Sequence, residues 1–186
     1  MIVSNDWNPL LNTDRLRLEP QVETHTDGLM CALESPQTHE FIPGDPPTDR
    51  EKFMDRMKKL ESRISPDGLQ RWLNWTVFSG LEVIGTVQAD ATDSTSSASI
   101  AYMFHPNSWG KGFAFEATSA MLEHLKSQGI SSFKAWTDTR NLASHKLLER
   151  LGFTKTEEIK TPMNSKEASV TSLSTCSSWK VKRICF

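Results

Sequence analysis

SWGKGFA, residues 108–114, lies between a predicted strand and a predicted helix. Its two glycines, Gly110 and Gly112, allow backbone N–H groups to turn toward a ligand without interference from a Cβ atom. The N-terminus of a helix offers unpaired N–H donors and roughly half a positive charge, which suits an anion such as a pyrophosphate. Lys111 adds another positive charge. A G-x-G pair alone, however, favours an ordinary strand-to-helix turn.

The segments around this loop predict a crossover between two parallel strands. A strand at 98–104 precedes the loop, and a helix at 112–128, a strand at 133–138 and a helix at 141–151 follow it. Two strands joined through a helix lie parallel and near one another in a sheet.

The rest of the chain predicts antiparallel strands and two helices. Alternating apolar residues and turn signals favour the following elements: a strand at 15–18 before Pro20, a helix at 24–34, a helix at 49–64 with a capping box of Thr48 and Glu51, strands at 69–78 and 83–89, a loop at 90–97, and two more strands at 154–160 and 176–184. Together with the crossover, these elements predict a mixed sheet.

Length and composition favour one soluble domain over residues 1–186. The chain has 186 residues, of which 37% are hydrophobic and 24% charged, so neither disorder nor a membrane protein is indicated. A net charge of −2 gives no field that would gather nucleic acid. Without a signal peptide or an apolar run of about 18 residues, we expect a cytoplasmic protein with no membrane partner. Because Cys31, Cys176 and Cys185 lack C-x-x-C spacing, we expect free thiols and no metal.

A second motif follows downstream as NLASHKLLERLGF, residues 141–153. Asn141 suits the N-cap of a helix and Gly152 its C-terminal end, while the leucines between them suit the core. The spacing G-x-G-x-x-G of dinucleotide-binding folds and the G-x-x-x-x-G-K-[ST] spacing of P-loops are both absent.

The order and spacing of these motifs resemble the GNAT superfamily of N-acetyltransferases. Within it, the chain is similar to the branch that includes the ribosomal-protein N-terminal acetyltransferases of RimJ/RimL type. The residues that carry the resemblance are Leu11 to Leu18 as an opening strand, Val83-Ile84-Gly85 as a central strand, Trp109 to Ala114 as a pyrophosphate loop, and Asn141, Ser144, Gly152 and Phe153.

The resemblance implies an α/β (α+β) GNAT fold with about four helices. Its mixed, mostly antiparallel sheet of about seven strands would be splayed where acetyl-CoA binds, with the pyrophosphate on the loop before the Gly112 helix. The implied cofactor-binding residues are Met103, Phe104, Trp109, Gly110, Lys111, Gly112, Phe113, Ala114, Asn141 and Ser144. A backbone N–H near Met103 or Phe104 would polarise the thioester carbonyl, and Asn141 and Ser144 would lie along the pantetheine arm.

The chain departs from the superfamily at two positions. Trp109 stands where Gln or Arg is favoured, so backbone donors would carry the phosphate site. Leu148 stands where a tyrosine often serves as general acid, and the single tyrosine of the chain, Tyr102, precedes the loop. We therefore expect Ser144 to act as the catalytic residue that donates a hydrogen bond to the leaving thiolate, or to be only a small residue in the first helical turn.

The proton acceptor for the amine is left open among three residues, namely His39, Glu40 and Glu116. The resemblance places the segments at 35–47 and 164–175 beside the acceptor. Trp72 and Trp75 are further candidates for the cleft, although tryptophans on a strand usually belong to the core.

The sequence thus predicts an enzyme that transfers an acetyl group from acetyl-CoA to a primary amine. The N-terminal α-amino group of a protein or peptide is one candidate acceptor, and a small-molecule amine is another. A non-catalytic acyl-CoA-binding module is the alternative outside enzymes, because the usual tyrosine is missing. Either a monomer or a homodimer is compatible with the sequence.

Overall fold

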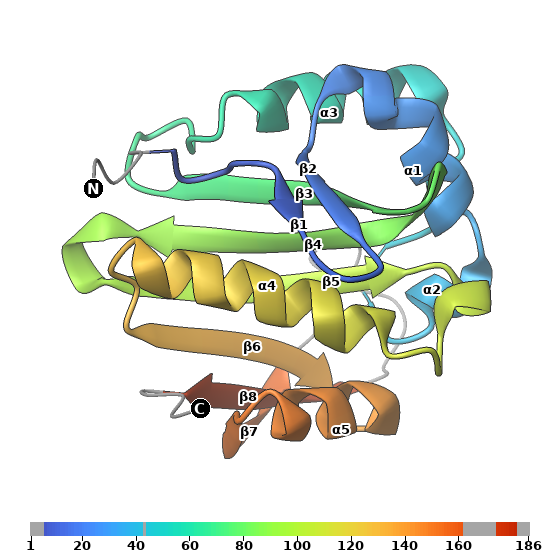
Figure 1. The fold of residues 1–186 in the computed structure, drawn as a ribbon. Coiled ribbons are helices and arrows are strands. Elements are labelled where there is room, and N and C mark those ends of the chain that lie inside the picture. The colour runs from blue at the N-terminus through green and yellow to red at the C-terminus, as the bar shows by residue number, and fades with distance from the viewer. Residues whose placement is uncertain (1–5, 43, 162–173, 182–186) are drawn as a thin grey trace.

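The computed structural model describes residues 6–42, 44–161 and 174–181 (Figure 1). Its strands are β1 (Leu11–Asn12), β2 (Arg17–Pro20), β3 (Arg71–Ser79), β4 (Glu82–Thr92), β5 (Ser97–Phe104), β6 (Ser132–Asp138), β7 (Thr154–Thr161) and β8 (Ser174–Val181). Its α-helices are α1 (Thr26–Leu33), α2 (Pro36–His39), α3 (Arg50–Glu61), α4 (Phe113–Ser127) and α5 (Leu142–Arg150). The mixed α/β fold predicted from the sequence is confirmed.

All of these strands join one sheet in the order β1-β2-β3-β4-β5-β6-β8-β7. Neighbouring strands are antiparallel except β5 and β6, which are parallel and are joined through α4. The crossover that residues 98–138 predict is therefore present. The last two strands also form as expected, with β8 between β6 and β7; positions 182–184 lie outside the described residues.

Two predictions of where strands begin and end were wrong. The opening stretch is a hairpin, because Thr13 donates its backbone N–H to the carbonyl of Leu16 and so turns β1 back onto β2. The loop expected at 90–97 is shorter, because β4 extends to Thr92 and β5 begins at Ser97, and Ala91 of β4 pairs with Ala98 of β5. Only a short 3₁₀ turn, Asp93–Thr95, connects these two strands.

The helices begin and end close to their predicted bounds, with two corrections at α3. Asp49, rather than Thr48, is its N-cap and accepts a hydrogen bond from the backbone N–H of Lys52. The helix ends at Glu61 instead of Ile64, because Arg63 adopts a positive φ of 57° and Ile64 forms a bridge to Arg71.

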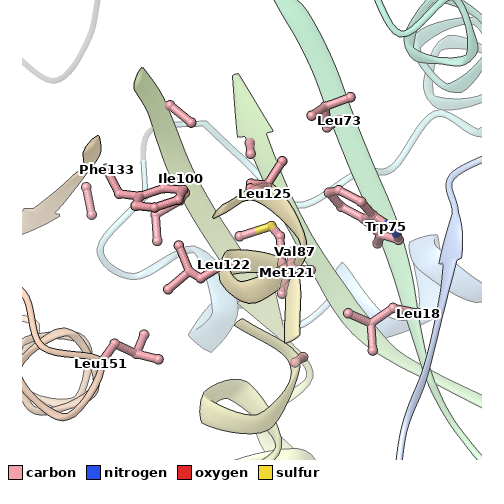
Figure 2. Close-up of a cluster of buried hydrophobic side chains, with 14 of the residues drawn as sticks. Leu18, Leu73, Trp75, Val87, Ile100, Met121, Leu122, Leu125, Phe133 and Leu151 are labelled. Carbon is pink, nitrogen blue, oxygen red and sulfur yellow. The ribbon is translucent and has the colours of Figure 1, made fainter. Parts of the chain in front are cut away.

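The main core lies between one face of the sheet and helices α4 and α5. Trp75, Val87 and Ile100 point from three neighbouring strands toward Met121, Leu122 and Leu125 of α4, as Figure 2 shows. These side chains share a face because they lie opposite or near one another in the sheet. Figure 1 shows α4 and α5 lying across the same face of the sheet.

Helices α1 and α3 pack on the opposite face. Residues of that face alternate with the core residues along β3 and β4, and they include Thr76 and Thr86. The side chain of Thr76 lies within hydrogen-bond distance of His25, just before α1. Each face of the central strands thus has its own helix pair, and the cavity described below opens between these layers.

Candidate active site

The sheet opens between β5 and β6. Their parallel pairing runs from Ser97 and Ser132 to Ile100 and Ala135, and there it ends. Strand β5 nevertheless continues to Phe104, paired with β4 on its other side only. Met103 and Phe104, the residues predicted to face the thioester, therefore lie on the splayed part of β5.

Gly85 lets β4 approach this part of β5 closely. A Cβ atom on Gly85 would lie 2.3 Å from the carbonyl oxygen of Met103 and 2.9 Å from the Cα atom of Phe104. Any larger residue would push these strands apart, because backbone atoms cannot yield as a flexible side chain can. The close approach of β4 and β5 therefore explains why position 85, in the Val83-Ile84-Gly85 segment, is a glycine.

The predicted phosphate loop leads directly into the N-terminus of α4. Gly110 and Gly112 have positive φ angles of 72° and 81°, which L side chains rarely adopt. Gly112 is the N-cap and offers no side-chain acceptor, and the first helical bond runs from Glu116 N–H to Gly112 oxygen. The N–H groups of residues 113–115 therefore have no intrahelical partner and fit an anion such as a pyrophosphate.

Trp109 contributes packing rather than a donor at this loop. Its side chain is 51% exposed, and its indole Nε1–H donates to the carbonyl of Phe104 at 2.9 Å. The single N–H of the Trp109 side chain is therefore already used, which leaves backbone N–H groups as the donors for a phosphate. Lys111 is exposed.

The N-terminus of α5 lies across the opening from β5. Asn141 is its N-cap, with Oδ1 accepting from the backbone N–H of Ser144 at 3.0 Å. The hydroxyl of Ser144 lies 2.6 Å from the hydroxyl of Tyr102 on β5. Burial raises the pKa of Tyr102 to about 12, although the hydrogen bond with Ser144 acts in the opposite direction.

A cavity of about 1000 Å³ brings these residues together. It extends from α1 and α3 to the opening between β5 and β6, and its lining includes Tyr102, Met103, Asn141 and Ser144. The glycine loop instead lines a second hollow of about 690 Å³, beside the turn between β1 and β2. Of the loop residues predicted for the cofactor, Gly110, Lys111 and Gly112 line this second hollow.

The three candidate bases are in different situations. His39 lines the large cavity; its Nε2 donates to the carbonyl of Leu33 at 3.0 Å, and its Nδ1 has no hydrogen-bond partner among the described residues. Glu40 is exposed and does not line the cavity. Glu116 accepts hydrogen bonds from Thr13 and Arg15 at both carboxylate oxygens.

Part of the acceptor segment at 35–47 borders the cavity, including Phe41, Ile42 and Asp45. Most of the second segment, at 164–175, lies outside the described residues. Of the two interpretations given for Trp75, cleft or core, the structure shows the core: Trp75 is fully buried and donates its indole N–H to Pro9. Trp72 is absent from the lining of the cavity as well.

Tyr102 is the residue whose placement the sequence did not reveal. Its alternation with Ile100 places it on the same face of β5 as the core, but no sequence pattern links it to Ser144. Leu148, at the position where a tyrosine was expected, is 1% exposed and belongs to the core. The hydroxyl nearest Ser144 therefore comes from a strand rather than from α5.

Over residues 6–42, 44–161 and 174–181, no cluster of three or more metal-ligating side chains is present. Within the same ranges, every helix is too short or too polar to span a membrane. Cys31 is an exposed free thiol, whereas Cys185 and the side chain of Cys176 lie outside what is described.

Comparison with known proteins identifies relatives of the chain. The family model of the acetyltransferase (GNAT) domain matches residues 15–154. A relative from Bacillus licheniformis, described as the uncharacterized N-acetyltransferase p20, is 29% identical over 147 residues, which are 78% of this chain and 82% of the relative.

Solved structures show the same fold at low sequence identity. Mycobacterium smegmatis RimJ in complex with CoA-disulfide has a TM-score of 0.79 and 17% identity, covering 94% of this chain and 88% of RimJ. The microcin C7 self-immunity acetyltransferase MccE, in complex with acetyl-CoA and AMP, has a TM-score of 0.76 and 14% identity, covering 92% of this chain and 94% of MccE.

Proposed function

The chain belongs to the GNAT family of acetyltransferases, and from that premise we propose that it transfers an acetyl group from acetyl-CoA to the N-terminal α-amino group of a protein or peptide. The observation that carries the proposal is the uncapped N-terminus of α4 after two glycines of positive φ. It supports an anion site made of backbone donors, and CoA carries a pyrophosphate.

When bound, acetyl-CoA supplies the acetyl group as a thioester, whose carbonyl carbon bonds to the amine nitrogen as the carbon–sulfur bond breaks. The chain must then polarise the carbonyl and stabilise the departing thiolate. Backbone N–H groups near Met103 or Phe104 are the candidates for the first role, because β5 lacks a strand partner on the β6 side there. Oxyanion donors of this kind contribute roughly 3 kcal/mol in other enzymes.

Ser144 is the candidate for the second role. In our proposal its hydroxyl hydrogen points to the sulfur, while Tyr102 donates its own hydrogen to the oxygen of Ser144. The 2.6 Å distance brings the two hydroxyls within hydrogen-bond range, and the raised pKa of Tyr102 means that the phenol keeps a proton to donate at ordinary pH. Tyr102 is thus a positioning residue, and Ser144 is the group that touches the thiolate.

His39 is the candidate that receives the amine proton. It is the one of the three candidates that borders the large cavity. Its Nε2–H bond to Leu33 leaves Nδ1 to take the proton, and Nδ1 is buried with no hydrogen-bond partner among the described residues. The carboxylate of Glu116 is occupied at both oxygens and is not proposed as a base.

The size and charge of the cavity favour a peptide over a small cationic amine. About 1000 Å³ is at the upper end of small-molecule sites, which leaves room for an extended peptide end. Its charged lining mixes Asp45, Asp49 and Asp138 with Lys52 and Arg56, and the carboxylate of Asp138 is paired with Arg140, so the lining is not an acidic pocket for a polyamine. The carboxylate of Asp49 is moreover engaged by Lys52.

A thiol-release assay with acetyl-CoA tests the proposal. Peptides with a free α-amine should release CoA thiol, whereas the same peptides with a blocked N-terminus and an internal lysine should not. Turnover of blocked lysine peptides at the same rate would contradict α-amine acetylation.

The second candidate is a small-molecule amine acetyltransferase, which the structural similarity to MccE favours. Under this alternative, small amines are acetylated while free-α-amine peptides are not. Binding of acetyl-CoA without thiol release from any peptide or amine would indicate a non-catalytic module.

A further inference from the structure

The turn between β1 and β2 contacts the first turn of α4, although more than a hundred residues separate them in sequence. The hydroxyl of Thr13 donates to Glu116 Oε1 at 2.6 Å, and the backbone N–H of Arg15 donates to the same oxygen at 3.0 Å. Because Glu116 belongs to the first turn of α4, these bonds join the turn to the helix that the phosphate loop precedes.

The side chain of Arg15 extends this connection to the loop itself. Its Nε donates to Glu116 Oε2 at 2.7 Å, and its Nη2 lies 2.5 Å from the same oxygen. Its Nη1 donates to the carbonyl oxygen of Lys111 at 3.0 Å, and its guanidinium lies 4.7 Å from the centre of the Phe113 ring. One guanidinium therefore holds the residues on both sides of Gly112. We call Thr13, Arg15, Lys111 and Glu116 the Arg15 cluster.

The Arg15 cluster affects anion binding in two ways, through the flexibility of the loop and through the carboxylate of Glu116. Glycines at positive φ make the loop intrinsically flexible, and a fixed conformation reduces the entropy that binding must remove. The cluster also supplies the carboxylate of Glu116, in the first turn of α4, with donors at both oxygens. A free carboxylate there would compete with a bound anion for the positive end of the helix.

The protonation state of Glu116 agrees with this arrangement. Partial burial favours its neutral form, but the hydrogen bonds from Thr13 and Arg15 outweigh this effect, so its pKa lies below the usual range. The pair remains charged at neutral pH. Because Arg15 is about half exposed, the ion pair itself contributes little to global stability, and its main effect is on the geometry of the loop.

We propose that Thr13 and Arg15 are positioning residues that hold the loop at Lys111 and Gly112 in the conformation that binds the CoA pyrophosphate. This inference rests on the proposed function. It assigns a role to Thr13 and Arg15 of the opening Leu11–Leu18 segment.

The test compares two acetyl donors that differ in the pyrophosphate. For Arg15→Ala, KM for acetyl-CoA should rise about tenfold, the scale of one lost hydrogen bond to a charged group, while kcat stays within about twofold. With S-acetylpantetheine, which lacks the pyrophosphate, Arg15→Ala and the unaltered protein should have equal kcat/KM. Arg15→Lys should raise KM for acetyl-CoA as well, because an ammonium cannot hold Glu116 and Lys111 together in the geometry of the guanidinium fork.

Arg17→Ala is the matched control. Arg17 also forms an ion pair, with Glu19 at 2.6 Å, and also stacks on a phenylalanine, Phe78 at 4.7 Å, but it does not contact the loop. Its KM for acetyl-CoA should not change. The proposal would be overturned if Arg15→Ala lowered kcat/KM equally with acetyl-CoA and with S-acetylpantetheine, or if it left KM for acetyl-CoA unchanged. If the unaltered protein itself binds no acetyl-CoA, the proposed function fails instead.

Discussion

At the scale of single residues, the pair of hydroxyls on Tyr102 and Ser144 is the feature most open to experiment. Ser144 has one hydrogen to donate, and that hydrogen is available to a thiolate only if it is not donated to Tyr102. Tyr102 is placed by β5 to be the donor instead, at 2.6 Å. The core position of Leu148 also explains why a tyrosine is not required on α5.

We expect Tyr102→Phe to lower kcat about tenfold, the scale of one hydrogen bond, with KM for acetyl-CoA within about twofold. Ser144→Ala should lower kcat at least as much, and adding Tyr102→Phe to it should cause no further loss, because both changes remove one arrangement. Steady-state kinetics of the single and double variants measure this coupling.

Ser127→Ala is the control for the hydroxyl pair, since the Ser127 hydroxyl donates to His124 oxygen at the far end of α4. Independent, multiplicative losses in the Tyr102→Phe/Ser144→Ala double variant would show that the two hydroxyls do not act together. Because the pKa of Tyr102 is about 12, its ionisation should not shape the pH–rate profile below about pH 11.

At the scale of elements, Asp138 connects the end of β6 to the start of α5. Its carboxylate is 1% exposed and accepts from the backbone N–H, Nε and Nη2 of Arg140, each at 2.9 Å. Its carbonyl accepts from the backbone N–H of Asn141 and lies 3.1 Å from His145 Nε2. This junction determines where the N-terminus of α5, and therefore Ser144, lies.

The hydrogen bonds from Arg140 lower the pKa of Asp138 below its ordinary value of 3.8. A lowered folded-state pKa stabilises the fold above the pKa of the unfolded chain, and this stabilisation is lost as the pH falls through the folded-state value. Asp138→Asn should therefore lower the free energy of unfolding by about 2 kcal/mol at pH 7. The difference should shrink as the pH falls from 5 to 3.

Urea denaturation across this pH range measures the effect of Asp138→Asn, with the exposed Asp55→Asn as the control. A difference from the unaltered protein that stays constant down to pH 3 would mean that the charge of Asp138 does not stabilise the junction.

At the scale of the whole molecule, the sheet separates two helix layers, and the opening between β5 and β6 connects them. Each layer would contact part of the acetyl donor. The loop and α4 lie on one face of the sheet, while α1 and α3 border the cavity from the other. A ligand that connects these parts should stabilise the folded state as a whole, by roughly 2.7 kcal/mol at 100 times its dissociation constant.

We therefore expect acetyl-CoA to raise the melting temperature by several degrees, about 2–4 °C per kcal/mol for a chain of this size. Gly112→Glu should abolish the shift, because it places a negative charge and a side chain at a position of φ +81°. Gly129→Ala is a matched control, since Gly129 also has a positive φ (+95°) but lies after the other end of α4. No shift at millimolar acetyl-CoA, or a full shift in Gly112→Glu, would contradict the loop assignment.

The sequence by itself determined the features that depend on neighbouring residues. The alternation of apolar residues predicted the strand that became β3, and Gly112 and Asn141 marked the starts of α4 and α5. Such signals are local, because side-chain direction and capping follow from the backbone within one or two turns. The fold was predicted from the order and spacing of all the motifs and their resemblance to the GNAT superfamily, and the phosphate loop stays a prediction.

Only the tertiary structure decided which distant side chains meet. Glu116 was a candidate base in the sequence, but Thr13 and Arg15 occupy its carboxylate; Tyr102 was a remote tyrosine, but its hydroxyl reaches Ser144. These pairs are 103, 101 and 42 positions apart, so no local pattern relates them. Their contact depends on the packing of α4 and α5 on one face of the sheet, which brings the β1–β2 turn and β5 to the starts of these helices.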